Sequence, residues 1–342
     1  MNTPSPLISN YLPRTLEAVV ARASNRYKGI LVTGMRQVGK STMLRRMMGQ
    51  RRYVNLDRFQ VLDLARNAPD AFFKQYPLPA LIDEFQRAPN LGLELKAILD
   101  ETDERGLVWL TGSHKLGLRQ TVAEALSGRV ASFELFPLSL YELQGRGAEH
   151  KPFLPSGELT RGSLAPLSPE EIWSIIWQGS WPEVSRDDPD QRDVFFDSLL
   201  RTYIEKDVLS TGVRRITDFE RFLAVLASRI GQEFAIGEVQ KETGIAAETA
   251  RDWLSVAVAT GLSTCFPLFM RTWENAHQKA EALFYRHGFC RLALPLAEPS
   301  GFALNIQRRF VLRKFRRDGN FEKLEAQRQN STLLLLSRHR QK

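Results

Sequence analysis

The sequence predicts an α/β fold in which a mostly parallel β-sheet is covered by helices on both faces. Three observations carry this prediction. Short apolar runs of strand length alternate with segments of helical period over the first 150 residues. The first run opens into a glycine-rich loop, and two later runs end in acidic or small polar residues. Strands that alternate with crossover helices pair in parallel, and parallel sheets are buried on both faces.

The glycine-rich loop follows the apolar strand 29–33 and precedes a segment of helical period. Glycine, four residues, glycine, lysine and serine between a strand and a helix is the pattern of a phosphate-binding P-loop. The glycines let the backbone turn so that successive N–H groups face a phosphate, and the helix N-terminus adds positive potential there. We therefore predict a nucleotide site formed by Gly34, Arg36, Gln37, Val38, Gly39, Lys40, Ser41 and Thr42.

Roles within this site follow from phosphoryl-transfer chemistry. Lys40 is expected to reach the β- and γ-phosphates, and the Ser41 hydroxyl to ligate Mg²⁺. The apolar run 79–82 leads into two adjacent acids. Asp83 is predicted to hold Mg²⁺, directly or through water, and Glu84 to polarise the attacking water. The alternative is a strand that ends in two solvated acids.

Two later positions are further candidates for catalysis. The run 107–110 ends in Thr111-Gly112-Ser113, where Ser113, with Thr111 as second choice, is expected to sense the γ-phosphate. A plain strand-end turn is the alternative. Arg129 precedes the strand 130–135 and is a candidate arginine finger for the nucleotide of a neighbouring subunit, which implies a homo-oligomer. It is otherwise a solvated turn residue.

The chain divides into four predicted parts. Residues 1–150 form the P-loop domain, 151–225 a helical linker or lid, 226–285 a winged helix-turn-helix module and 286–342 a basic C-terminal segment. The module consists of two short helices on either side of Gly244, followed by a strand. Its second helix begins with alanines and Glu248, and offers Arg251 as its one strong base-reading side chain. This favours a lid or a protein-interaction module over sequence-specific DNA binding, and both kinds of partner remain open.

Composition restricts the setting of the protein. Cys265 and Cys290 are its two cysteines, so no disulfide framework is indicated. The first residues lack the pattern of a signal peptide, and no apolar run approaches the ~20 residues of a membrane span, so we expect a cytoplasmic protein without membrane contact. The net charge is +8, and residues 301–342 carry eleven basic and three acidic residues. The basic balance therefore belongs to the tail and indicates nothing about the folded body.

The chain resembles a bacterial family of AAA-like P-loop ATPases that carry a winged-helix segment and a C-terminal domain of unknown function with a restriction-nuclease-like fold. The matching stretches are Tyr11–Arg14, Leu31–Ser41, Tyr53–Asp57, Leu81–Glu84, Leu110–Ser113, Ser127–Val130, Phe136–Ser139, Gly179–Glu183, Tyr203–Asp207 and the helix-turn-helix. The resemblance implies nucleotide contacts from Gly34 to Thr42, with Asp83 and Glu84 as metal and water residues. It ends near Tyr285, and the acid and Glu-x-Lys strand of the family's C-terminal domain have no counterpart in residues 286–342, a degenerate or truncated remnant.

These patterns together predict Mg²⁺-dependent hydrolysis of ATP, coupled to the winged-helix module. The alternative is a nucleotide-gated switch that binds DNA or a protein partner and uses hydrolysis only to reset its state. A small-molecule kinase fits less well, because the adjacent acids Asp83 and Glu84 suit attack by water.

Overall fold

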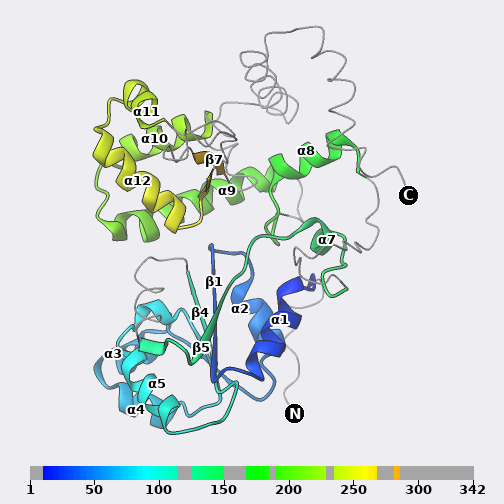
Figure 1. The fold of residues 1–342 in the computed structure, drawn as a ribbon, viewed down its shortest axis with the longest axis vertical. Helices are drawn as coiled ribbons and strands as arrows, with labels where there is room; N and C mark the ends of the chain where they lie inside the picture. The colour runs from blue at the N-terminus through cyan, green and yellow to red at the C-terminus, as the bar shows by residue number, and fades with distance from the viewer. Residues whose placement is uncertain are drawn as a thin grey trace, which may run out of the picture.

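The computed structural model describes residues 11–113, 125–149, 167–184, 189–228, 235–267 and 281–285. Two parts are visible in it, an α/β part that ends at residue 149 and a mostly helical part that begins at residue 167 (Figure 1). A helix over 116–126, which the apolar spacing indicates, lies largely outside the described residues, and the tail 286–342 lies wholly outside them.

The α/β part is built on one five-stranded sheet. Its strands are β1 (Gly29–Gly34), β2 (Arg52–Asn55), β3 (Ala80–Asp83), β4 (Val108–Ser113) and β5 (Val130–Glu134), in the order β2-β3-β4-β1-β5. Every neighbouring pair is parallel, which confirms the predicted fold class. Strand β4 lies between β1 and β3, and its register sets Ser113 beside Gly34. The carboxyl ends of these three strands therefore meet at one edge of the sheet.

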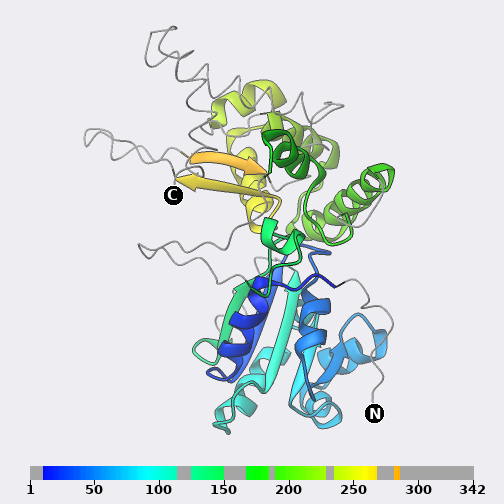
Figure 2. The same cartoon turned by 90° about the vertical axis from the view of Figure 1, so that its right-hand side faces the viewer.

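Helices cover both faces of this sheet (Figures 1 and 2). On one face Ile30 and Val32 of β1 share an apolar cluster with helices α1 (Thr15–Ser24) and α2 (Lys40–Met47). On the other face Leu31 shares a second cluster with α3 (Phe59–Asn67), α4 (Pro69–Gln75) and α5 (Leu91–Asp100). Successive residues of one strand thus enter opposite clusters, as the period of two in a β-strand requires.

Two helix boundaries differ from what the local sequence pattern alone indicates. A single helix over 61–73 is expected from the apolar spacing, but the chain forms α3 and α4 with a break at Ala68. The reason is Pro69, which disfavours helical geometry in the residue before it and suits the first position of a new helix. Thr15 is expected to be the N-cap of α1, whereas that position belongs to Arg14, whose N–H donates to the Glu17 carboxylate at 2.7 Å.

The second part is mostly helical. It follows α7 (Leu140–Leu143) and contains α8 (Pro169–Gln178), α9 (Pro189–Tyr203), the π-helical turn η3 (Ile204–Val208), the 3₁₀ turn η4 (Leu209–Thr211), α10 (Ile216–Ser228), α11 (Ile236–Thr243) and α12 (Ala247–Ala259). Strands β6 (Ser263–Pro267) and β7 (Glu281–Tyr285) form an antiparallel pair. The two helices, the left-handed turn at Gly244 (φ 72°) and the following strand lie where the sequence predicts them. The winged-helix assignment itself stays a prediction.

One apolar cluster continues from the α/β part into the helical part. Its buried members include Met43 of α2, Trp181 after α8, Phe196 of α9 and Phe219 of α10. The glycine-rich loop belongs to this cluster through Met35 and Val38, and is therefore packed against the helical part. In the described part of the chain, no helix is both long and apolar enough to cross a lipid bilayer.

Candidate nucleotide-binding site

The glycine-rich loop leaves β1 at Gly34 and enters α2 at Lys40. Gly34 has a φ of 151°, and a Cβ there would lie 2.3 Å from the carbonyl oxygen of Leu135. Gly39, at φ 95°, is the left-handed N-cap of α2. A side chain at Gly34 would therefore displace backbone, and one at Gly39 would be strained, which explains why the pattern places glycine at both ends of the loop.

Lys40 spans the loop from its end to its beginning. Its side chain is buried, and its Nζ donates to the carbonyls of Gly34 at 3.0 Å and Met35 at 2.7 Å. The ammonium group is thus held across the turn on which the loop amides lie. A buried cation at this place supplies positive potential for an anionic ligand.

Asp83 lies at the centre of a hydroxyl network beside the loop. Its Oδ1 accepts from the hydroxyl of Ser41 at 2.7 Å and from the hydroxyl of Thr111, and its Oδ2 accepts from the hydroxyl of Tyr53 at 2.8 Å. The donors come from α2, β4 and β2, so three separate elements converge on one buried carboxylate. Ser41 and Asp83, the two predicted metal residues, are brought together. Their all-oxygen donor set fits Mg²⁺, which prefers oxygen ligands.

Tyr53 is a member of the site whose role sequence reasoning missed. Burial, followed by the hydrogen bond to Asp83, raises the pKa of the Tyr53 hydroxyl, so it remains a donor. The Arg45 guanidinium lies 4.7 Å from the centre of its ring. A tyrosine in a short strand carries no functional pattern of its own. Only the pairing of β2 with β3 places it beside the acid.

Glu84 follows Asp83 at the end of β3 and adopts left-handed backbone angles, with φ 59°. Its N–H donates to the Thr111 hydroxyl at 3.2 Å, and its carboxylate accepts from the side-chain amide of Gln86 in the 3₁₀ turn η2 (Phe85–Arg87). Thr111 therefore connects both acids. Ser113 has its backbone paired with Gly34, but its side chain lies outside what the structure describes.

The remaining loop residues lie where the pattern predicts, and one contact to them was not foreseen. Gln37 has a left-handed φ of 60°, and Thr42 lies in the first turn of α2. The backbone carbonyl of Arg36 accepts from the indole N–H of Trp181 at 3.1 Å. Trp181 is fully buried and lies 145 residues along the chain, so no local pattern could have indicated this contact.

Arg129 lies at the amino-terminal end of the parallel strands, opposite the end from which the P-loop leaves. Its carbonyl accepts from the N–H of Gly29, the first residue of β1, whereas the P-loop follows the last. Its guanidinium binds Asp100 through two hydrogen bonds, one of them 2.9 Å long, and this contact lowers the pKa of the Asp100 carboxyl. Arg129 is thus separated from its own chain's P-loop by the length of β1, and the finger hypothesis requires a neighbouring subunit.

Comparison with known proteins gives two family matches. Residues 26–144 match a family model described as an AAA domain. Residues 169–294 match a model described as a domain of unknown function, DUF8612. The first match covers the P-loop, the sheet and the Asp83 network, so this part of the chain is similar to AAA domains.

Individual proteins are also similar to this chain. The uncharacterized proteins Mb2031c of Mycobacterium bovis and Rv2008c of Mycobacterium tuberculosis are each 29% identical over 244 residues, which is 70% of this chain and 50% of theirs. The chain therefore spans about half the length of these curated relatives. The solved Walker-type ATPase PABY2304 of Pyrococcus abyssi is similar with a TM-score of 0.50 at 14% identity, covering 86% of this chain and 99% of that one. At this identity the likeness shows the fold alone.

Proposed function

We propose that the protein binds ATP with Mg²⁺ at the P-loop and hydrolyses it. The observation that carries the proposal is the contact of the Asp83 carboxylate with the Ser41 hydroxyl, 2.7 Å away, at the mouth of a loop spanned by Lys40. An amide-lined loop, a buried cation and an acid on the P-loop serine are the parts that phosphoryl transfer from a nucleotide requires. Magnesium, when bound, would neutralise charge on the phosphate oxygens.

Each residue of the site has a defined task in this proposal. The loop amides from Gly34 to Thr42 bind and orient the phosphates, and Lys40 contacts the β- and γ-phosphates. Ser41 and Asp83 would hold the metal, with Tyr53 and Thr111 orienting the Asp83 carboxylate.

The attacking water is assigned to Glu84. Its carboxylate lies one residue beyond the metal acid and is oriented by Gln86, so it can accept a proton from a water placed in line with the γ-phosphate. Ser113 is proposed to contact the γ-phosphate from the neighbouring strand end. Arg129 is proposed to act only between subunits.

Replacement of Glu84 tests this assignment. Glu84→Gln is expected to bind ATP as the wild type does and to lose roughly 10²–10⁴-fold in turnover, the usual contribution of a general base. Glu101→Gln, at an exposed position after α5, is the matched control and should keep full turnover. Turnover in Glu84→Gln equal to the wild type would remove Glu84 from the mechanism.

A nucleotide-gated binding switch is the second candidate. It is favoured by the hydrogen bond from Trp181 to the Arg36 carbonyl, through which the P-loop contacts the helical part. A DNA mobility-shift assay with and without ATP, repeated across a salt series, tests one class of partner. Nucleotide-dependent binding with a steep salt slope would support the switch, and equal binding in both conditions would contradict it.

A further inference from the structure

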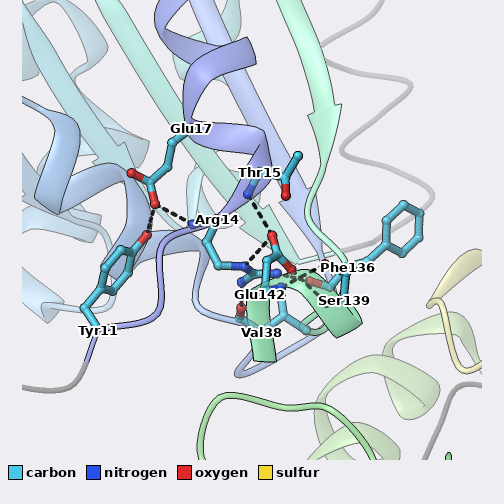
Figure 3. Close-up of polar contacts among 8 residues, drawn as sticks. All are labelled: Tyr11, Arg14, Thr15, Glu17, Val38, Phe136, Ser139 and Glu142. Atoms are coloured by element: carbon cyan, nitrogen blue, oxygen red, sulfur yellow. Dashed lines mark hydrogen bonds and ion pairs between the residues drawn. The ribbon is translucent and has the colours of Figure 1, made fainter. Parts of the chain in front are cut away.

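Arg14 is a buried arginine that no step of the proposed reaction uses. It lies directly before α1 and its side chain is 3% exposed. Its guanidinium donates to the carbonyl of Val38 at 2.8 Å and to the carbonyl of Phe136 at 2.5 Å, and forms an ion pair with Glu142 at 3.2 Å (Figure 3). One side chain thus joins the N-terminal segment, the P-loop, the chain after β5 and helix α7.

Glu142 completes this cluster from the other side. Its side chain is 6% exposed, and it accepts from the N–H groups of Thr15 and Ser139, each at 2.8 Å. The carboxylate therefore contacts the first residue of α1 and the N-cap of α7 in addition to Arg14 (Figure 3). A buried ion pair gives little net stability by itself, but a pair whose two members make several further hydrogen bonds favours one arrangement of the segments that it joins.

The contact with Val38 lies at the back of the nucleotide loop. In a P-loop the amides face the phosphates, so the Val38 carbonyl that Arg14 contacts is available from the opposite side. A Cβ placed on Gly39 would lie 3.7 Å from the Arg14 guanidinium, which shows how closely this group packs behind the turn that presents Lys40. Movement of Arg14 would release the loop next to its lysine.

We propose that Arg14 is a positioning residue, which holds the P-loop in its nucleotide-binding shape and connects that shape to segment 136–142, where the chain leaves the sheet. The inference rests on the proposed binding of ATP. Beyond ATP binding, the proposal states that Arg14 connects the loop, through hydrogen bonds and an ion pair, to the chain that leads to the helical part. Arg14 itself is not a catalytic residue, since it contacts the loop from behind.

The first test is a binding titration with a non-hydrolysable ATP analogue and Mg²⁺, followed by calorimetry. In Arg14→Lys the ammonium cannot serve three partners as the guanidinium fork does, and the Kd should rise roughly tenfold at unchanged stoichiometry. Glu142→Gln, which does not touch the loop, should raise the Kd in the same direction by a smaller factor. The control Arg22→Lys, exposed in the last turn of α1, should bind as the wild type does.

The two measured quantities separate positioning from mere support of the fold. If Arg14 only stabilised the fold, the variant would contain fewer competent molecules, so stoichiometry would fall while the Kd stayed constant. That result, or an unchanged Kd at full stoichiometry, overturns the proposal. Should Arg14→Lys not fold, Glu142→Gln carries the same comparison.

A second test needs no nucleotide. Amide hydrogen exchange in Arg14→Lys should be faster than in the wild type in peptides that cover 35–40 and 136–143, and unchanged in β3. Equal acceleration of exchange across the whole sheet, or no acceleration in the loop, would overturn the proposal that Arg14 holds the loop. Failure of the wild type to bind nucleotide would instead refute the proposed function, and the exchange result would still decide whether Arg14 holds the loop.

Discussion

The α/β part and the helical part are held together by different kinds of interaction. Among the described residues, the buried charged side chains are Arg14, Lys40, Asp83 and Glu142, and all four belong to the α/β part. The buried polar side chains of the helical part, as far as the structure describes it, are uncharged hydroxyls such as that of Thr260. Most of its interior is apolar or aromatic, with Trp253 packed edge-on against Phe219 and Phe222 at 5.4 and 5.6 Å.

This difference indicates where ligand chemistry is located. Burying a charge costs several kcal/mol unless it is paired and hydrogen-bonded, so a fold gathers such groups only where they have partners or a task. Here they lie on both sides of one loop, Lys40 and Asp83 at its mouth and the Arg14–Glu142 pair behind it. The helical part provides a packed surface against that loop.

The comparison predicts that the aromatic core of the helical part is essential for stability but not for chemistry. Trp253→Ala should lower the free energy of unfolding by ~3–5 kcal/mol, because a large buried side chain is replaced by a cavity. Denaturant unfolding followed by circular dichroism measures this loss. Nucleotide affinity, measured at denaturant concentrations well below the unfolding midpoint, should be unchanged. A large loss of affinity in folded protein would contradict the idea that the helical core serves stability and not nucleotide binding.

For Lys40 the main expected effect is on nucleotide affinity. Lys40→Met removes the buried cation and should weaken ATP binding by about 2–5 kcal/mol, a factor of thirty or more, since an anion then loses its charged partner. Lys28→Met is a matched control, because the Lys28 ammonium also donates to a backbone carbonyl, that of Leu99, at the other edge of the sheet. Isothermal titration of both variants measures the difference, and equal losses would show that the effect is structural.

Removal of one of the hydroxyls around Asp83 is expected to have a smaller effect, on the Mg²⁺ requirement. Tyr53→Phe deletes one of three donors to the carboxylate and should cost about 1 kcal/mol, seen as a several-fold rise in the Mg²⁺ concentration needed for half-maximal ATP turnover. Tyr76→Phe, in which a ring packed on Phe72 is kept, is the control. An unchanged magnesium requirement in Tyr53→Phe would remove Tyr53 from the metal site.

The groups at the mouth of the P-loop and those that pack against it from elsewhere in the chain also differ in how far the sequence could predict them. The P-loop, the strands and the contact of Ser41 with Asp83 depend on local pattern and parallel pairing, and both are encoded by short stretches. Arg14, Glu142 and Trp181 act across 24 to 145 residues, where contact is decided by how helices pack on the sheet. No periodicity or motif specifies such a distance.

The partly exposed pair Asp100–Arg129 is the counterpart of the buried pair Arg14–Glu142. Its removal should have the smallest of these effects, a slight loss of stability. The hydrogen bond from Arg129 lowers the pKa of Asp100 in the folded state. A carboxyl with a lowered folded-state pKa adds stability above its unfolded pKa of ~3.9, and this addition is lost as the pH falls through the folded value. Asp100→Asn should therefore be slightly less stable than the wild type at pH 7, and the difference should vanish in acid and shrink in high salt.

Thermal melts from pH 7 to pH 2, with Asp103→Asn as an exposed control, measure this dependence. A difference that persisted at pH 2 would mean that Asp100 stabilises the fold through something other than its charge.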